Sequence, residues 1–585
     1  MSEHAIARER IHELVHEHGL DKVVLSADVE RWIRWAARAL SVVTIAITVA
    51  ALVEYGPPRG HDYVAWEETA SIAALAFATA GLLIAWFWEP LGASLAIVAG
   101  AFVGALGAYQ YSLLIAVGVA ALYLLPAGLF LLAWQRTQSW VSVIVIAVTV
   151  GLVLALTMGM AYAFYYDAQG PTHGASSAPA LVPSPVEWIW SGGVTGVAAV
   201  VVASVPDGTD VSLTVWPEDE PDQPTSIVPV SRGSVYRFEI DGLIPGVGYR
   251  YAVEVDGELD DVRTGSFATP DPEATRFVVA FASCARVGSN GQVFDTIRDR
   301  KPDLFINTGD FFYGDVQSNN LDAFSSLFDV TLTQPGQHAL YRSTPIAYVW
   351  DDHDYGPNDA AKDSPSRPAA LVSYRAMVPH YPFALEGDDA PIAQAFTLGP
   401  VRFIMTDTRS ARDPKTDPDG PEKSMLGAEQ LEWFLGELDE AMRSHEVVVW
   451  VNSVPWIAEA EAGADHWGGY THERTAIANA IADMDSDRLI MLTGDAHMVA
   501  IDDGSHSDYS DHGEAGFPVM NAAALDRGGS VKGGPYSHGA VAGGGQFGLM
   551  TIERTDDRVD VLLQGLTWEN DEIMSLSLSF PTKAQ

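Results

Sequence analysis

Side chains that can bind metal ions follow five apolar segments of the sequence, each at the point where the segment ends. They are Cys284 after RFVVAFAS, Asp310 and Tyr313 around DLFINTG, Asp352 and His353 after PIAYVWD, Asn452 after EVVVWV, and Asp495 and His497 after RLIMLTG. Carboxylates and carbonyls suit Ca²⁺, Mn²⁺ or Mg²⁺, whereas a thiolate and a phenolate favour iron or zinc. Both kinds of ligand at one place predict a mixed two-metal centre, which can clamp a phosphoryl group for attack by a bridging hydroxide.

The elements that must position these residues are apolar strands alternating with helical patterns from residue 276 onward. Such a pattern is typical of a layered α/β domain with buried strands. Polar residues cluster where the strands end, and in such sheets the carboxyl ends of the strands form the site.

Each candidate ligand also has a structural interpretation. A lone buried cysteine usually fills a core, and Tyr313 by itself would be a packed aromatic residue. Asn452 could cap a turn, and Arg286 could pair with a neighbouring carboxylate. The acidic residues around His353 could form a solvated turn, but they follow a fully apolar strand. Burying several like charges there would need a cation to relieve their repulsion.

Three motifs occur in a characteristic order: Gly-Asp-x-x-Tyr at 309–313, Asp-Asp-His-Asp at 351–354 and Gly-Asp-x-His at 494–497. Together with Ser283-Cys284 they resemble the PhoD-type alkaline phosphatases, members of the calcineurin-like metallophosphoesterase superfamily. The resemblance covers about residues 186–570. It implies two or more metal ions, Fe³⁺ with Ca²⁺, with Zn²⁺ or Mn²⁺ as alternatives.

The resemblance also implies a role for individual residues. Asp310 would bridge both metals, Cys284 and Tyr313 would bind the ferric-type ion, and His497 or Asp495 would complete the sites. Further expected ligands are Asp352, at the place of an asparagine in the wider superfamily, and Asn452.

Catalysis and substrate binding are expected from a second group of residues. By the same resemblance, His353 stabilises the transition state or protonates the leaving oxygen. Arg286 could hold a phosphate oxygen as a bidentate fork. The family more often has Gln directly after the cysteine, where this chain has Ala285. A stretch that resembles the family's Asp-x-Trp-x-Gly-Tyr segment is expected to build the substrate rim, with Asp465, Trp467, Tyr470 and Arg474.

The N-terminal part of the chain predicts a membrane segment. A polar, Arg-containing segment at 1–36 is followed by five apolar segments near the length of a bilayer span, at 37–55, 69–88, 91–108, 111–134 and 140–165. The basic flanks place the N-terminus in the cytoplasm, so the chain from residue 166 would emerge on the extracytoplasmic side. Residues 91–134 are only weakly divided into two spans. A single tilted span there would change the number of spans from odd to even.

Between the predicted spans and the α/β domain lie two further segments. Residues 167–185 are small, polar and Pro-rich, typical of a linker. Residues 186–270 alternate in short stretches separated by Gly and Pro turns, which predicts a β-sandwich, and Leu243–Tyr251 resembles the fibronectin type III tyrosine-corner strand. We therefore expect a multidomain chain: transmembrane helices, a fibronectin III-like β-sandwich, and a PhoD-like metallophosphoesterase domain at 276–570.

Composition excludes other classes. The net charge is −42, with 34 Lys+Arg against 76 Asp+Glu, so a nucleic-acid-binding surface is not expected. A single cysteine excludes an intramolecular disulfide framework, and no Gly-x-Ser-x-Gly elbow occurs.

We expect a membrane-anchored, extracytoplasmic, metal-dependent phosphoesterase that hydrolyses phosphate mono- or diesters, with a phosphate ester as substrate and the lipid bilayer as partner. One alternative is a metal-binding pseudoenzyme or a module that binds surface polymers. Another is a membrane transporter or sensor with an accessory domain, although the predicted spans carry no charge at their centres.

Overall fold

The computed structural model describes residues 27–55, 65–110, 113–134, 175–206, 210–230, 233–484, 487–513 and 515–583. The chain separates into two compact units, Met1–Ala168 and Gln169–Gln585. Each unit has its own hydrophobic core.

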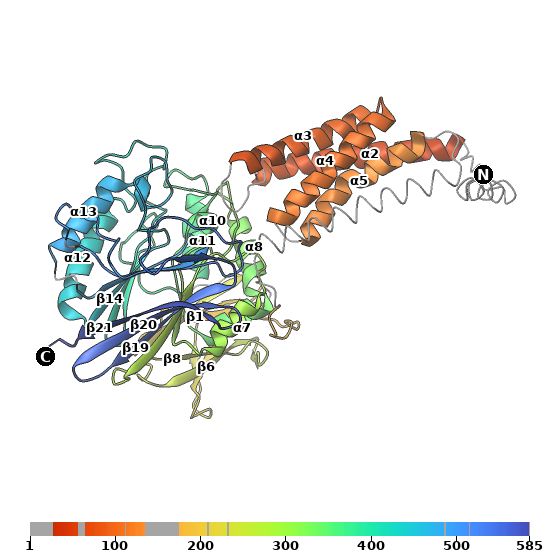
Figure 1. The fold of residues 1–585 in the computed structure, drawn as a ribbon. Helices are drawn as coiled ribbons and strands as arrows, with labels where there is room; N and C mark the ends of the chain where they lie inside the picture. Colours follow the sequence, from red (N-terminus) through yellow and green to blue (C-terminus); the bar gives the residue numbers. More distant parts are fainter. Residues whose placement is uncertain are drawn as a thin grey trace, which may run out of the picture. The chain divides into compact units, whose positions relative to one another are not determined.

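Four long helices make up the described part of the first unit (Figure 1). They are α2 (Ala27–Tyr55), α3 (Ala65–Ala85), α4 (Glu89–Gln110) and α5 (Leu113–Trp134). Glycine lets two of them approach closely, because a Cβ at Gly92 would lie 2.1 Å from the backbone nitrogen of Ala85. The Thr48 hydroxyl lies 2.7 Å from the Tyr123 hydroxyl on another helix. The helices therefore pack directly on one another.

The first four predicted spans fall on these four helices, and the fifth, 140–165, lies outside the described residues. Among the described residues, two stretches are long and apolar enough to cross a membrane by length and composition, Asp28–Ala50 and Val117–Trp134. Two shorter apolar stretches are Ala73–Ala85 and Glu89–Ala105. The number of spans and their orientation stay predictions.

Two large sheets form the body of the second unit. In its described part the first sheet has the order β21-β20-β19-β9-β10-β11-β1-β2-β5 and the second the order β12-β13-β14-β15-β17-β16-β18. The strands of the first sheet are β1 (Trp188–Gly192), β2 (Ala198–Ser204), β5 (Val235–Asp241), β9 (Arg276–Ala282), β10 (Leu304–Asn307), β11 (Ile346–Tyr348), β19 (Gln546–Arg554), β20 (Arg558–Thr567) and β21 (Glu572–Pro581). Those of the second are β12 (Gln394–Leu398), β13 (Val401–Met405), β14 (Val447–Val451), β15 (Leu489–Thr493), β16 (Met498–Asp502), β17 (Val519–Ala522) and β18 (Ala540–Ala542).

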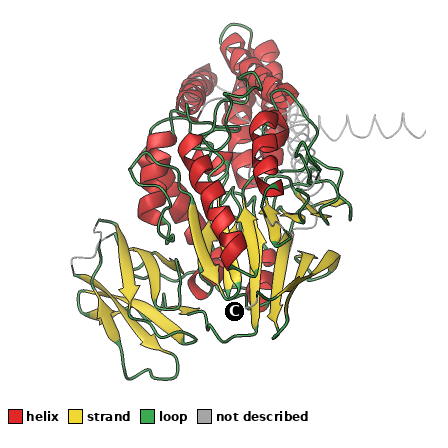
Figure 2. Cartoon of the chain, turned by 90° about the vertical axis from the view of Figure 1, so that its left-hand side faces the viewer, coloured by secondary structure: helices red, strands yellow, loops and turns green. Residues whose placement is uncertain are grey.

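The two sheets face each other, and helices cover their outer faces (Figure 2). The alternation of side chains along β14 shows this arrangement. Val447, Val449 and Val451 join the core between the sheets, whereas Val448 and Trp450 join the core under α12 (Ala428–Ser444) and α13 (Thr471–Ala482). The helices of the unit are α7 (Gln292–Asp299), α8 (Leu321–Leu332), α9 (Pro335–Ser343), α10 (Asp352–Tyr355), α11 (Arg367–Met377), α12 (Ala428–Ser444) and α13 (Thr471–Ala482). The predicted layered α/β architecture with buried strands is confirmed.

A smaller sheet accompanies the predicted β-sandwich region. It contains β3 (Val211–Pro217), β4 (Thr225–Ile227), β6 (Gly248–Val255), β7 (Glu258–Leu259) and β8 (Gly265–Ala268). This sheet shares a core with β1, β2 and β5, yet those three strands also extend the large sheet, since Gly192 of β1 pairs with Ile346 of β11. The Tyr249 hydroxyl accepts a hydrogen bond from the Ile244 backbone N–H at 3.0 Å, the contact typical of a tyrosine corner. The classification of this β-sandwich region as fibronectin III-like stays a prediction.

The described part of the predicted linker, 175–185, is held on the second unit. The hydroxyls of Ser176 and Ser177 donate hydrogen bonds to Asp295 of α7, at 2.8 and 2.9 Å. The Ser176 backbone N–H also donates to the Asn290 carbonyl. These contacts fix the chain where it enters the second unit.

Candidate metal centre

The carboxyl ends of parallel strands from both large sheets meet at one place. β9, β10 and β11 run parallel in the first sheet, and β13, β14 and β15 run parallel in the second. Cys284 follows β9 and Asp310 follows β10, and the Cys284 thiol lies 3.5 Å from Asp310 Oδ2. Cys284 Sγ also lies 3.8 Å from the carbonyl oxygen of Asp495, which follows β15 of the other sheet. The segments predicted to converge therefore do so.

The loops at this edge hold an uncommon backbone conformation. Cys284, Asp310 and Asp495 have φ angles of +66°, +52° and +62°. Such angles cost a non-glycine residue about 1–3 kcal/mol and cluster at functional sites. Gly309 precedes Asp310 with φ +112°, and a Cβ there would lie 2.6 Å from the Asp351 Cβ. The sharp turn after β10 therefore needs glycine at this position.

Asp310, Asp352 and His353 form the centre of the cluster. One potential ligand atom from each lies within 4.8 Å of the others, and all three residues are buried. Burial raises the pKa of Asp310 to about 7, and repulsion by Asp352 and Asp495 adds to the rise while His353 opposes it. Carboxylates buried this close together are a fitting site for cations.

Cys284 adds a sulfur donor to this oxygen-rich cluster. Its side chain is fully buried, and burial together with the nearby Asp310 raises the pKa of the thiol well above its usual range. The Ser283 hydroxyl lies 3.1 Å from the sulfur. A thiolate at this position would need a positive partner such as a metal ion.

Tyr313 and His497 meet beside the cluster. The His497 Nδ1–H donates to the Gly528 carbonyl at 2.7 Å, which leaves the Nε2 lone pair to face the Tyr313 hydroxyl at 3.0 Å. A backbone carbonyl that fixes the far nitrogen in this way is the usual support of a metal-binding histidine. Burial, with Asp310 nearby, raises the pKa of Tyr313 well above its usual range.

Asp495 pairs with Lys532, whose Nζ lies 2.7 Å from Oδ1. Lys532 belongs to the loop after β17, which also supplies the Gly528 carbonyl under His497. One loop therefore supports two of the predicted ligands.

His353 is held by Asp315, since its Nδ1 lies 2.8 Å from the carboxylate, and its ring packs on Tyr313 with the ring centres 4.1 Å apart. Burial lowers the pKa of His353, but the carboxylates of Asp315, Asp352 and Asp310 outweigh it, and the pKa lies well above the usual range. The imidazole can therefore carry a proton at neutral pH.

The side-chain amide oxygen of Asn452 is engaged in hydrogen bonds within the fold. Its amide oxygen accepts from the Val454 backbone N–H at 3.1 Å and from the Trp467 indole N–H at 3.3 Å. Two donors use both lone pairs of that oxygen. A ligand role for Asn452 would require at least one of these hydrogen bonds to be given up, and that role stays a prediction.

The predicted substrate rim is wrong for three of its four residues. Trp467 and Tyr470 are 0% exposed and Arg474 is 3% exposed, so none of them can present a face to an organic leaving group. Trp467 packs against Trp456 with ring centres 5.2 Å apart, and the Arg474 guanidinium donates to the carbonyls of Trp456 and Ala458. These three residues are therefore part of the protein core, where the aromatic rings of the tryptophans pack against each other.

The fourth rim residue, Asp465, joins a buried ionic network. Arg409 donates to both oxygens of Asp465, at 3.1 and 2.7 Å, and its Nε lies 2.5 Å from Asp351. Arg412 also donates to Asp465, at 2.6 Å. Burial disfavours the Asp465 carboxylate, but the two arginines hold its pKa well below its usual range. The predicted sites did not include Arg409, although it follows β13 just as the predicted ligands follow their strands.

A second carboxylate group adjoins the first. Asp352, Asp359 and Asp465 bring one oxygen each within 4.8 Å of one another. Lys415 pairs with Asp359 at 2.6 Å, so this group already has basic partners.

Arg286 is engaged by a carboxylate. Its backbone N–H donates to Asp526 Oδ1 at 2.7 Å and its Nε donates to Oδ2 at 3.2 Å. The structural interpretation of Arg286 as an ion-pair partner is therefore the one observed.

Arg527, which sequence reasoning did not select, lies on Tyr313. Its guanidinium carbon is 3.6 Å from the centre of the Tyr313 ring, and the residue is 3% exposed. Burial lowers the pKa of its guanidinium well below the usual range.

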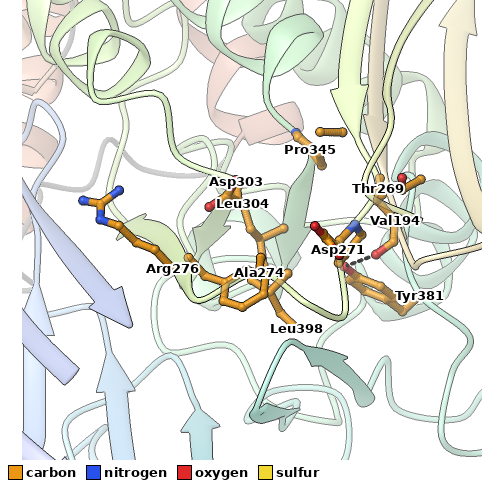
Figure 3. Close-up of a pocket in the computed structure, with 14 residues that line it drawn as sticks. Val194, Thr269, Asp271, Ala274, Arg276, Asp303, Leu304, Pro345, Tyr381 and Leu398 are labelled. Carbon is orange, nitrogen blue, oxygen red and sulfur yellow. Dashed lines mark hydrogen bonds between the residues drawn. The ribbon is translucent and has the colours of Figure 1, made fainter. Parts of the chain in front are cut away.

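A cavity of about 130 Å³ lies away from this cluster (Figure 3). Its lining includes Arg276, Leu304 and Pro345, which stand at the amino ends of β9, β10 and β11. In the same lining the Tyr381 hydroxyl donates to the Val194 carbonyl at 3.0 Å. The cavity therefore lies at the opposite ends of the strands from the predicted ligands.

Comparison with known proteins agrees with the geometry. Residues 277–530 match the family model of the PhoD-like phosphatases, and residues 26–142 match a model described as a domain of unknown function, DUF7670. Alkaline phosphatase D of Bacillus subtilis (strain 168) is 26% identical over 310 residues, which are 44% of this chain and 52% of that protein. The chain thus spans about half the length of this curated relative.

A solved structure supports the fold. The structure of PhoD superposes with a TM-score of 0.54 at 18% identity, covering 68% of this chain and 94% of that one. This likeness shows that the two proteins share a fold. The family model covers the segment of this chain that carries the cluster. Residues 277–530 form a PhoD-like phosphatase domain.

Proposed function

We propose that this chain hydrolyses phosphate mono- or diesters at a metal centre built around Asp310 and Asp352. The observation that carries the proposal is the convergence of Asp310, Asp352 and His353 within 4.8 Å in a buried cluster. The PhoD-like phosphatase domain in which the cluster lies supports it.

The donor set fits two kinds of metal ion. Carboxylate oxygens suit Ca²⁺, and the sulfur and phenol donors beside them suit Fe³⁺, with Zn²⁺ or Mn²⁺ as alternatives. The ligands we propose are Cys284, Asp310, Tyr313, Asp352, Asp495 and His497. When bound, the metal ions supply Lewis-acid stabilisation of the phosphoryl group and lower the pKa of the attacking water.

The chain's own residues orient the reaction. Asp315 holds the His353 imidazole through Nδ1 at 2.8 Å, which leaves Nε2 as the nitrogen that can face a substrate. We propose that Nε2 donates its proton to the oxygen of the leaving alcohol. No side chain needs to form a covalent phosphoenzyme.

We further propose that the N-terminal helices anchor the phosphatase domain to a membrane, with that domain on the extracytoplasmic side. Two apolar stretches long enough for a span and the Arg-containing segment before them support this arrangement. Protease treatment of intact cells tests it, because an extracytoplasmic domain is cut and a cytoplasmic one is protected.

The function is tested with the full-length protein in detergent. p-Nitrophenyl phosphate and bis(p-nitrophenyl) phosphate report monoester and diester hydrolysis, and elemental analysis reports bound metal. We expect turnover that a chelator removes and added metal restores. Asp310→Asn should lose turnover and keep the wild-type circular dichroism spectrum.

The alternatives predict different results. If metal-loaded wild-type protein binds metal but hydrolyses neither ester, a binding module or pseudoenzyme is the better description. Wild-type rates in Asp310→Asn would contradict the proposed centre.

A further inference from the structure

Arg527 is a buried arginine whose guanidinium has no anionic partner in the described part of the chain. It is 3% exposed, and its buried Nε has no hydrogen-bond acceptor there. The other buried arginines of the described residues each donate side-chain hydrogen bonds; they are Arg263, Arg409, Arg412 and Arg474. Arg527 therefore stands apart from arginines whose role is to hold the fold together.

An unpaired buried cation is costly. Taking a charged side chain out of water without a counter-charge costs several kcal/mol, and buried charges in folded proteins are normally paired. Such a residue is typical of a site that an anionic ligand completes.

The carboxylate next in sequence does not neutralise Arg527. Asp526 is committed to Arg286, at 2.7 Å to its backbone N–H and 3.2 Å to its Nε. The Asp526 backbone N–H in turn contacts the Cys284 carbonyl at 3.4 Å. The segment is thus fixed against the loop that carries Cys284, and Asp526 is engaged with Arg286 and not with the Arg527 guanidinium.

The position of Arg527 joins it to the metal cluster. Its guanidinium carbon lies 3.6 Å from the centre of the Tyr313 ring. That ring packs on His353, and its hydroxyl contacts His497 at 3.0 Å. One aromatic ring therefore separates the Arg527 guanidinium from the groups proposed to bind metal and to protonate the leaving oxygen.

We propose that Arg527 binds the phosphoryl group, donating from its guanidinium to non-bridging oxygens of the substrate and of the product phosphate. The inference rests on the proposed function. Binding of a phosphate oxygen is the role expected of Arg286 from the sequence. We assign it instead to Arg527, whose guanidinium has no carboxylate partner among the described residues. A planar fork on a phosphate is the arrangement that arginine forms best.

Inorganic phosphate is the probe, measured on the metal-loaded full-length protein by calorimetry and as a competitive inhibitor of p-nitrophenyl phosphate hydrolysis. The variants are Arg527→Met, which keeps length without charge, and Arg527→Lys, which keeps charge without the fork. Arg263→Lys is the matched control, because Arg263 is also buried but donates to the Val182 and Glu187 carbonyls.

We expect Arg527→Met to weaken phosphate binding about tenfold to a hundredfold, the worth of a hydrogen bond to a charged group. Arg527→Lys should lie between Arg527→Met and wild type, KM for the ester should rise in parallel, and bound metal should be unchanged. Arg263→Lys should bind phosphate as wild type does.

Phosphate affinity within twofold of wild type in Arg527→Met overturns the inference. A loss of affinity that only follows a loss of bound metal also overturns it, because Arg527 would then act through Tyr313. If wild-type protein hydrolyses no ester but binds phosphate in an Arg527-dependent way, the proposed function fails and this inference stands.

Discussion

The imidazole of His353 and the carboxylate of Asp315 form a hydrogen bond of 2.8 Å between Nδ1 and Oδ1. The loop around Asp315 is also tied to His353 through the backbone, because the N–H groups of Gly314 and Asp315 both donate to the His353 carbonyl at 3.1 Å. Asp315 has a φ of +48°, so this loop holds a conformation that few residue types adopt readily. Asp315 therefore fixes the orientation and protonation of a histidine next to a proposed ligand.

Replacing Asp315 should reveal the role of His353. We expect Asp315→Asn to lower kcat about tenfold to a hundredfold, because the imidazole loses its anionic support, and to leave bound metal unchanged. The loss should be larger for esters of alkyl alcohols than for p-nitrophenyl phosphate, since a poor leaving group depends more on protonation.

His353→Asn is the reference for that measurement and should show the same dependence on the leaving group. An equal loss on good and poor leaving groups in both variants would contradict a proton transfer from His353. The comparison of rates across an ester series therefore separates this role from simple damage to the site.

Much of the candidate site could be predicted from the ends of the strands. A fully apolar strand followed by polar residues is a local pattern, and parallel neighbours bring those ends together. Cys284, Asp310 and Asp495 follow it, and they meet in the structure. Arg409 follows β13 in the same way, but the pattern selects metal ligands, and an arginine side chain is not one.

Other features depend on contacts that no local pattern records. Trp467 resembles a rim residue in sequence, yet its burial comes from packing on tryptophans from other segments. The pairing of Gly192 with Ile346, which joins the sandwich region to the large sheet, links residues far apart in the chain. Arg527 lies in a glycine-containing loop, and only the structure shows that its buried Nε has no acceptor among the described residues.

Trp467 should be a stability residue and not a specificity residue. It is 0% exposed, and its indole donates to Asn452 at 3.3 Å. We expect Trp467→Ala to lower the free energy of unfolding by about 3–5 kcal/mol, the usual cost of removing a buried tryptophan. The ratio of monoester to diester rates should stay at the wild-type value.

Trp467→Phe separates the two contributions of the side chain. It keeps most of the packing and loses one hydrogen bond, so it should cost about 1 kcal/mol. Unfolding in urea measures both variants. A changed ester ratio with unchanged stability would restore the predicted substrate rim.

His338 should make the protein sensitive to acid. Burial, with Arg342 and Arg263 nearby, lowers its pKa from 6.5 to about 3. Below pH 6.5 the unfolded chain therefore binds a proton at this site that the folded chain does not, and stability falls as the pH drops from 6.5 toward 3. At pH 5 the loss is about 2 kcal/mol, at 1.36 kcal/mol per pH unit.

His338→Asn tests this linkage. The His338 Nδ1–H donates to the Leu332 carbonyl at 3.1 Å, and the asparagine amide offers a donor that does not titrate. Whatever its stability at pH 7, the variant should lose about 2 kcal/mol less than wild type between pH 7 and pH 5. The exposed His472, replaced by Asn, is the control, and equal losses in wild type and His338→Asn would contradict the linkage.

Cys284 should bind metal as a thiolate and release its proton when it does so. Burial and the carboxylate of Asp310, 3.5 Å away, raise the pKa of the thiol well above its usual range, so the metal-free protein keeps the proton at pH 7.5. Coordination requires the thiolate, and metal binding therefore displaces the proton into the buffer.

Calorimetric titration with metal in two buffers of different ionisation enthalpy counts the released protons. Wild type should release about one more proton than Cys284→Ser. Ser283→Ala removes the hydroxyl 3.1 Å from the sulfur and should release as many protons as wild type. Equal proton release by wild type and Cys284→Ser would show that the sulfur is not a ligand, because a coordinating thiol would have released its own proton in addition.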